Sequence, residues 1–138
     1  MHLPVPPEVA FDYLVDPANR AEWQPSLARV EDVVGPVGVG QRWVDVTRPG
    51  LRPLMETTEL DRPHRWTERG TWRTFSAELT LEFAPAPGGC EVEPTMRLRA
   101  RGPAGLAARV LDRLAPLAVR ADLRNAGRIL GSRSRGTA

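Results

Sequence analysis

The sequence predicts a single α+β domain in which an antiparallel sheet follows two short helices and precedes one long helix. Three observations predict this order. A proline-bounded apolar stripe lies near the N-terminus, six short runs separated by turn residues occupy positions 27 to 100, and a helical periodicity follows from position 104. Strands joined by tight turns are typical of an antiparallel meander, and a chain of 138 residues is long enough for one hydrophobic core.

Two short helices are predicted at the N-terminal end. Pro6-Pro7 opens the first, because a proline in the first turn loses no hydrogen bond. Phe11 and Leu14 lie on its apolar stripe. Pro17 ends it, since the residue before a proline avoids the helical conformation. Residues 18–22 are expected to form the second helix.

Six strands are expected between these helices and the last one. Their ranges are 27–34, 41–48, 52–60, 64–69, 73–83 and 90–100. The last two alternate apolar and polar residues most regularly, which is typical of strands with one buried and one solvated face. The glycine-rich segment 35–40 is read as a hairpin turn and not as a phosphate-binding loop, because it has no lysine and no following helix.

The final helix is predicted from residue 104 to about residue 130. Its expected buried face consists of Leu106, Val110, Leu114, Leu117 and Ala121. Pro116 lies inside this pattern and is expected to kink or split the helix. Residues 1–131 are therefore assigned to one domain, and residues 132–138 to a disordered polar tail.

Composition excludes several classes of function. All 19 basic residues are arginine, which removes lysine Schiff-base chemistry and a P-loop. The two histidines and Cys90 have no metal-site spacing, so we expect no metal and no cofactor. A net charge of +2 gives no reason to expect a nucleic-acid partner. The absence of a signal peptide, of a long apolar run and of a cysteine pair predicts a cytoplasmic protein without a transmembrane segment.

The N-terminal sequence pattern is similar to that of a known family. The pattern Pro-Glu-Val-x-Phe-x-x-Leu-x-Asp-Pro over residues 7–17, closed by Trp-x-Pro at 23–25, resembles the START-like (SRPBCC) superfamily, in particular its polyketide cyclase/dehydrase and lipid-transport branch. The resemblance covers nearly the whole chain. It implies the helix-grip fold, in which a curved antiparallel sheet wraps the long C-terminal helix and encloses a cavity.

The resemblance also implies a function and a set of residues. The function is binding of a small hydrophobic ligand, which is aromatic, polyketide-like or lipid-like. The expected ligand-binding residues are Trp23, Trp43, Met55, Thr57, Trp66, Phe75, Ala77, Met96, Leu98, Leu114 and Leu117. Tryptophans suit such ligands because indole offers a large flat surface and one donor. Each tryptophan also has a second interpretation, as core filling.

Two other functions stay open. The chain could be an aromatase/cyclase-type enzyme, with Glu59, Thr57 and His64 as weak catalytic candidates and Thr57 and Glu59 facing inward. Cyclases of this kind place an arginine where this chain has glutamate, which favours binding over catalysis. The third hypothesis is that the domain is an interaction module. Paired, desolvated polar groups in the pocket would favour the enzyme, and an apolar pocket would favour a carrier. If Asp45 is buried, we expect Arg42, Arg48 or Arg65 to pair with it.

One edge of the sheet is expected to be incompletely covered. Family members usually begin with a full strand, whereas five residues precede Pro6 here. The strand over residues 90–100 would then lack part of its neighbour, and Pro94 within it is compatible with an edge position. A weak homodimer through this edge is therefore expected.

Overall fold

The structure, a computed structural model, describes residues 1–102 and 104–136. Within this part, the side chains of residues 104, 106–108, 110–111 and 113–114 lie outside the description. The helices are α1 (Pro7–Val15), the 3-10 turn η1 (Pro17–Asn19), α2 (Arg20–Trp23) and α3 (Ala104–Gly136). The strands are β1 (His2–Leu3), β2 (Leu27–Val34), β3 (Arg42–Thr47), β4 (Leu54–Asp61), β5 (Arg65–Trp72), β6 (Phe75–Ala86) and β7 (Gly89–Ala100).

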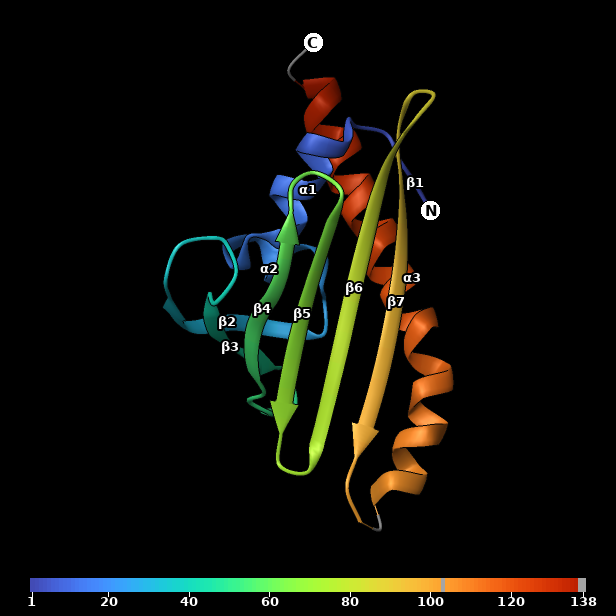
Figure 1. Ribbon diagram of the computed structural model, residues 1–138. Helices are drawn as coiled ribbons and strands as arrows, with labels where there is room; N and C mark the ends of the chain where they lie inside the picture. The colour runs from blue at the N-terminus through green and yellow to red at the C-terminus, as the bar shows by residue number, and fades with distance from the viewer. Residues whose placement is uncertain (103, 137–138) are drawn as a thin grey trace.

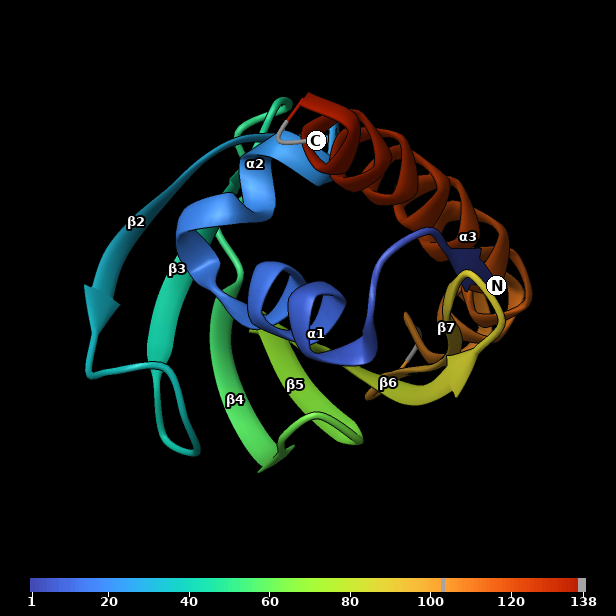
Figure 2. The same cartoon turned by 90° about the horizontal axis from the view of Figure 1, so that it is seen from above.

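The strands form one antiparallel sheet in the order β1-β7-β6-β5-β4-β3-β2. The sheet curves around α3, and α1 and α2 close one end of the resulting trough (Figures 1 and 2). The six main strands lie within two or three residues of their predicted bounds. The predicted α+β helix-grip architecture is confirmed.

The end of the trough under α1 is filled by a solid hydrophobic core. Phe11 of α1 meets Phe83 of β6 edge to face, with ring centroids 5.1 Å apart. Leu81 and Val92 are fully buried beside them, and so is Cys90. Burial of such side chains is the largest favourable contribution to folding, at about 25 cal/mol per Å² of apolar surface.

The inner face of α3 differs from the predicted stripe. The buried side chains of its described part are Val119, Leu123, Ala126 and Leu130, whereas Leu117 is 66% exposed. The prediction for Leu117, and for the exposed Ala121, is therefore wrong. The physical reason lies further along the helix. The face that carries Leu117 and Ala121 continues with Arg124 and Arg128, which are exposed, whereas the face that begins at Val119 is apolar throughout. The side chain of Leu114 lies outside the described residues.

The last helix is longer and more regular than predicted. It runs without interruption past Pro116, whose ring is exposed, and reaches Gly136. Residues 132–136, expected to be a polar tail, are thus helical. Arg133 accounts for this, because its guanidinium pairs with Glu22 at 3.0 Å and lies 5.4 Å from the centroid of the Tyr13 ring. Residues 137 and 138 lie outside the described part of the chain.

Three features reduce the number of unpaired backbone groups on the free edge of β7: pairing with β1, a proline, and a side-chain acceptor from α3. β1 pairs with β7 at Cys90, and the carbonyl of Met1 accepts the amide of Val92 at 2.8 Å. Amides on one edge alternate along a strand, so Pro94 removes the next donor on that edge. Further along, the amide of Leu98 donates to the carboxylate of Asp112 on α3 at 2.7 Å. The edge expected to attract a partner chain is thus partly satisfied within the chain.

Candidate functional site

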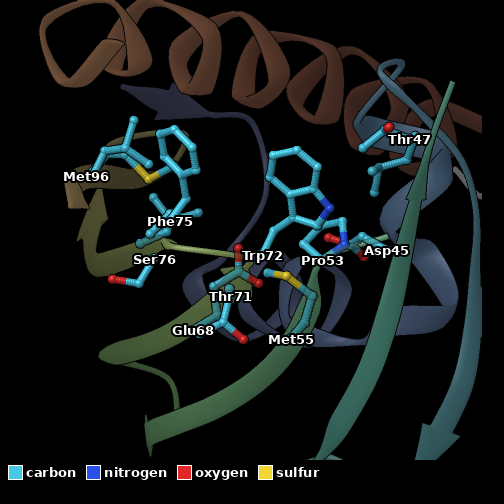
Figure 3. Close-up of a pocket in the computed structure, with 15 residues that line it drawn as sticks. Asp45, Thr47, Pro53, Met55, Glu68, Thr71, Trp72, Phe75, Ser76 and Met96 are labelled. Atoms are coloured by element: carbon cyan, nitrogen blue, oxygen red, sulfur yellow. The ribbon is translucent and has the colours of Figure 1, made fainter. Parts of the chain in front are cut away.

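A cavity of about 240 Å³ lies between the sheet and α3 (Figure 3). Its residues Trp72 and Phe75 flank the β5–β6 turn, which lies at the end of the sheet away from α1 (Figure 1). Five of the residues predicted to bind a ligand line the cavity: Met55, Phe75, Ala77, Met96 and Leu98. The wall is mainly apolar. Its residues come from β2 to β7, so the curvature of the whole sheet forms the hollow.

Small residues on adjacent strands leave the space open. Gly70 of β5 lies opposite Ala77 of β6 in the sheet register, and both line the cavity. A Cβ atom on Gly70 would lie 2.8 Å from the sulfur of Met55, which is closer than van der Waals contact allows. Because Gly70 has no side chain, the Met55 side chain can lie against β5 and need not move into the cavity.

Two aromatic rings form one side of the cavity. Trp72 and Phe75 flank the β5–β6 turn and stack with centroids 6.2 Å apart and an interplanar angle of 29°. Figure 3 shows both rings standing between the sheet and α3, with Glu68 and Met55 nearer the sheet. The guanidinium of Arg73 lies 4.7 Å from the Trp72 ring centroid. Stacked rings of this kind suit flat, apolar ligands.

A buried ion cluster forms another part of the wall. Arg20 of α2 donates from Nε and Nη2 to the two oxygens of Asp45 on β3, at 3.0 and 2.7 Å. Its Nη1 donates to Oε2 of Glu68 on β5 at 2.7 Å. We call these three residues the Arg20 cluster. All three are almost fully buried, and both carboxylates line the cavity.

Arg20 was not among the partners expected for Asp45. Of those partners, Arg42 pairs with Glu56 on the exposed surface, Arg48 donates to a backbone carbonyl, and Arg65 pairs with Glu59. Burial explains the difference. A buried carboxylate needs a partner that is itself buried, and α2 carries its arginine directly into the interior of the trough.

Burial shifts the acid–base properties around this cluster. Desolvation raises the pKa of Glu68, and the nearby charge of Asp45 raises it further, although Arg20 opposes both effects. Asp122 on α3 is within electrostatic reach of Arg20, and desolvation raises its pKa to about 6. The two carboxyls therefore hold protons at a higher pH than exposed carboxyls do, which is a property of many catalytic acids and bases.

Three of the tryptophans predicted to bind ligand are instead part of the packed interior: Trp23, Trp43 and Trp66 are each at most 1% exposed. The indole of Trp43 donates to Asp45 at 3.0 Å, and that of Trp66 donates to Thr57 at 3.1 Å. These residues do not line the cavity, and they hold the strands and the ion cluster in place. The hydroxyl of Thr57, which was also a catalytic candidate, is the group that accepts this hydrogen bond from Trp66.

The two remaining catalytic candidates lie on the surface. His64 is exposed at the β4–β5 turn, with Asp61 3.9 Å away. Glu59 is exposed and paired with Arg65, so its predicted inward orientation is wrong. A β-bulge is the reason: the register with β5 shifts between Thr57 and Glu59, and the extra residue turns the carboxylate to the other face.

The sequence contained a signal for some of the residues that were missed. Glu68 and Trp72 share strand parity with the inward Trp66, so alternation along β5 places both on the cavity side. Arg20 had no such signal, because its helix is four residues long and has no periodicity to interpret. Among the described residues, no cluster of histidine, cysteine or carboxylate side chains could hold a metal ion.

Comparison with known proteins places the chain in a family. The family model described as "Polyketide cyclase / dehydrase and lipid transport" matches residues 1–134. The chain belongs to this family. The matched range contains the residues that line the cavity and those of the Arg20 cluster. The match confirms the resemblance that the N-terminal pattern indicated. The sequence matches no curated protein.

Solved structures show the same fold at low sequence identity. A Thermus thermophilus protein has a TM-score of 0.73 and 25% identity, over 96% of this chain and 94% of its own. Ara h 8.0201 has a TM-score of 0.72 and 18% identity, over 95% and 94% of the two chains. A Rhodobacter sphaeroides protein has a TM-score of 0.70 and 19% identity, over 96% and 89%. In the described residues, no helix combines the length and apolar character that crossing a bilayer requires.

Proposed function

We propose that this domain binds a small hydrophobic molecule in the cavity between the sheet and α3. The observation that carries the proposal is the hollow itself: Phe75, Met96 and Leu98 leave a mainly apolar space unfilled where packed domains are normally solid. Membership of a family described by polyketide cyclisation and lipid transport supports a hydrophobic ligand. The filled core under α1 keeps the domain folded while this space is empty.

The volume limits the size of the ligand. An engineered apolar cavity of about 150 Å³ holds benzene, and drug-sized ligands occupy pockets of about 300–1,000 Å³. A cavity of about 240 Å³ therefore suits a substituted single ring or a compact bicyclic molecule. A long polyketide chain or a two-chain lipid would require the walls to move apart. The stacked Trp72 and Phe75 favour an aromatic body over a flexible chain.

The Arg20 cluster supports a second candidate function, proton transfer on the bound molecule. Glu68 lines the cavity, and burial raises its pKa, so it holds a proton to a higher pH than an exposed glutamate and can exchange that proton with a ligand. An aromatase/cyclase-type reaction would use this residue in place of Glu59. The candidate predicts turnover of a carbonyl-containing ring precursor that Glu68→Gln abolishes while ligand binding persists.

Filling the cavity tests the main proposal. Ethylbenzene is added to the protein, and binding is followed by NMR chemical-shift changes and by the change in melting temperature. Ala77→Leu places extra carbon atoms in the cavity and should abolish binding. Ala84→Leu on the exposed face of the same strand is the matched control and should bind as the unchanged chain does. No binding by the unchanged protein, or equal binding by both variants, would overturn the proposal.

A further inference from the structure

The buried charges in the cavity wall do not balance. Asp45 and Glu68 line the cavity, and the cation that contacts both of them is Arg20. Asp45 engages Arg20 through both oxygens, and its Oδ1 also accepts the indole N–H of Trp43. This pair is internally neutral and well supplied with hydrogen bonds. In its ionised form, which a neighbouring cation favours, Glu68 is the surplus negative charge.

Glu68 retains capacity to accept further hydrogen bonds. Its Oε2 accepts from Arg20 at 2.7 Å, and its Oε1 lies at a longer 3.4 Å from Nη2. An ionised carboxylate has about four acceptor sites, so the contacts that the described residues make leave part of this carboxylate unused. A further carboxyl, that of Asp122, is within electrostatic reach of Arg20, and it adds no positive charge.

The remaining wall complements an organic cation. Trp72 and Phe75 present aromatic rings to the same cavity, and the guanidinium of Arg73 lies 4.7 Å from the Trp72 ring centroid, so this ring already attracts a cation. A ring face attracts a cation, and the attraction strengthens when water is excluded. The apolar lining from Met96 and Leu98 accommodates a hydrocarbon body and offers nothing to a hydrated metal ion.

We propose that the cavity selects a small organic ammonium, a protonated amine on an aromatic or short hydrocarbon body, whose N–H groups donate to Glu68. The inference rests on the proposed function, because it names the class of hydrophobic molecule that the same cavity binds. The ammonium supplies the positive charge that the Arg20 cluster lacks. A carboxylate ligand is disfavoured, since the side-chain hydrogen bonds that Arg20 makes to the described residues all go to Asp45 and Glu68.

Three probes with the same carbon body separate the possibilities. They are 2-phenylethylamine, 2-phenylethanol and 3-phenylpropionate, measured near pH 7 by isothermal titration, with ethylbenzene as the uncharged reference. Both the ammonium and the hydroxyl can donate to Glu68, but only the ammonium adds a positive charge to the hydrogen bond, so the amine should bind at least about tenfold more tightly than the alcohol. The carboxylate should bind most weakly of the three.

Glu68→Gln tests the residue. The amide oxygen can still accept from Arg20, and the variant leaves Arg20 and Asp45 as a balanced pair. It should bind ethylbenzene as before and lose the preference for the amine. Asp122→Asn is the matched control, because it removes the same charge from a carboxyl near Arg20 that is not among the residues lining the cavity. It should change amine affinity by less than about twofold.

Every outcome decides between the two proposals. If ethylbenzene binds but the amine and the alcohol bind equally well, the ammonium inference is wrong and the proposed function stands. A preference for phenylpropionate would also overturn it, by showing that Arg20 binds anions. If no probe binds, the proposed function fails as well. Should Glu68→Gln not fold, the ranking of the three probes on the unchanged protein still decides the inference.

Discussion

Replacing Asp122 by asparagine tests the electrostatics between α3 and the Arg20 cluster. Asp122 lies on the inner half of α3, beside the fully buried Leu123, and it is itself half-buried. Its pKa is raised from the ordinary 3.8 to about 6 because desolvation outweighs the attraction of Arg20. The folded protein therefore favours the protonated carboxyl.

The sign and size of the effect follow from that shift. Because the folded pKa is above the unfolded one, the contribution to stability is complete below about pH 4 and is lost as the pH rises through about 6. A shift of about two pH units corresponds to about 3 kcal/mol. Since part of the carboxyl is solvated, screening reduces this to about 1–2 kcal/mol. Asp122→Asn removes the cost of the ionised form and should raise the melting temperature by several degrees at pH 7.5.

Thermal unfolding followed by circular dichroism between pH 4 and pH 8 measures this effect. The gain from Asp122→Asn should be largest above pH 6 and should disappear near pH 4. Asp61→Asn removes an equal charge from the exposed end of β4 and should leave the melting temperature nearly unchanged. A gain that is independent of pH, or a loss at pH 7.5, would refute the reasoning.

Two further predictions concern the ion cluster and the sheet edge. Arg20→Met should lower the free energy of unfolding in urea by about 3–5 kcal/mol near pH 7, because it leaves two buried carboxylates without their cation; a loss under about 1 kcal/mol would contradict the burial argument. Asp112→Ala should promote self-association at high concentration, measured by sedimentation velocity, because it frees the Leu98 amide on the β7 edge. Asp112→Asn keeps an acceptor oxygen and should stay monomeric, and equal behaviour of both variants would show that the edge is not the cause.

The strands were the most predictable part of the fold because their pattern is local. Alternation along residues 73–83 and 90–100 fixed which side chains of β6 and β7 face inward, and Phe75, Ala77, Met96 and Leu98 are on the expected side. The helix α3 was less predictable, because two apolar stripes compete after Pro116. Only the continuation of each stripe toward the C-terminus distinguishes the buried one.

The candidate site was predictable only in its apolar half. The alternation of inward and outward side chains along the strands predicted its hydrophobic wall. A β-bulge next to Glu59 interrupts that alternation, so the catalytic assignment that depended on it was wrong. The polar half depends on contacts between distant segments: Arg20 and Glu68 are 48 residues apart in the chain, and nothing local to either indicates the other. A tertiary ion pair of this kind becomes visible only when α2 is placed against the sheet.

The separation of filled core and open cavity along one pair of strands has a consequence for how such a domain can change. Moving along β6 from Phe75 to Phe83, the inward side chains pass from the cavity wall to the solid interior. Substitutions near the β5–β6 turn alter a space that contributes little to folding, whereas the Phe11–Phe83 end holds the molecule together. Mutations at the cavity end of the trough can therefore change which ligand binds. The packed end keeps the domain folded when such mutations lower its stability.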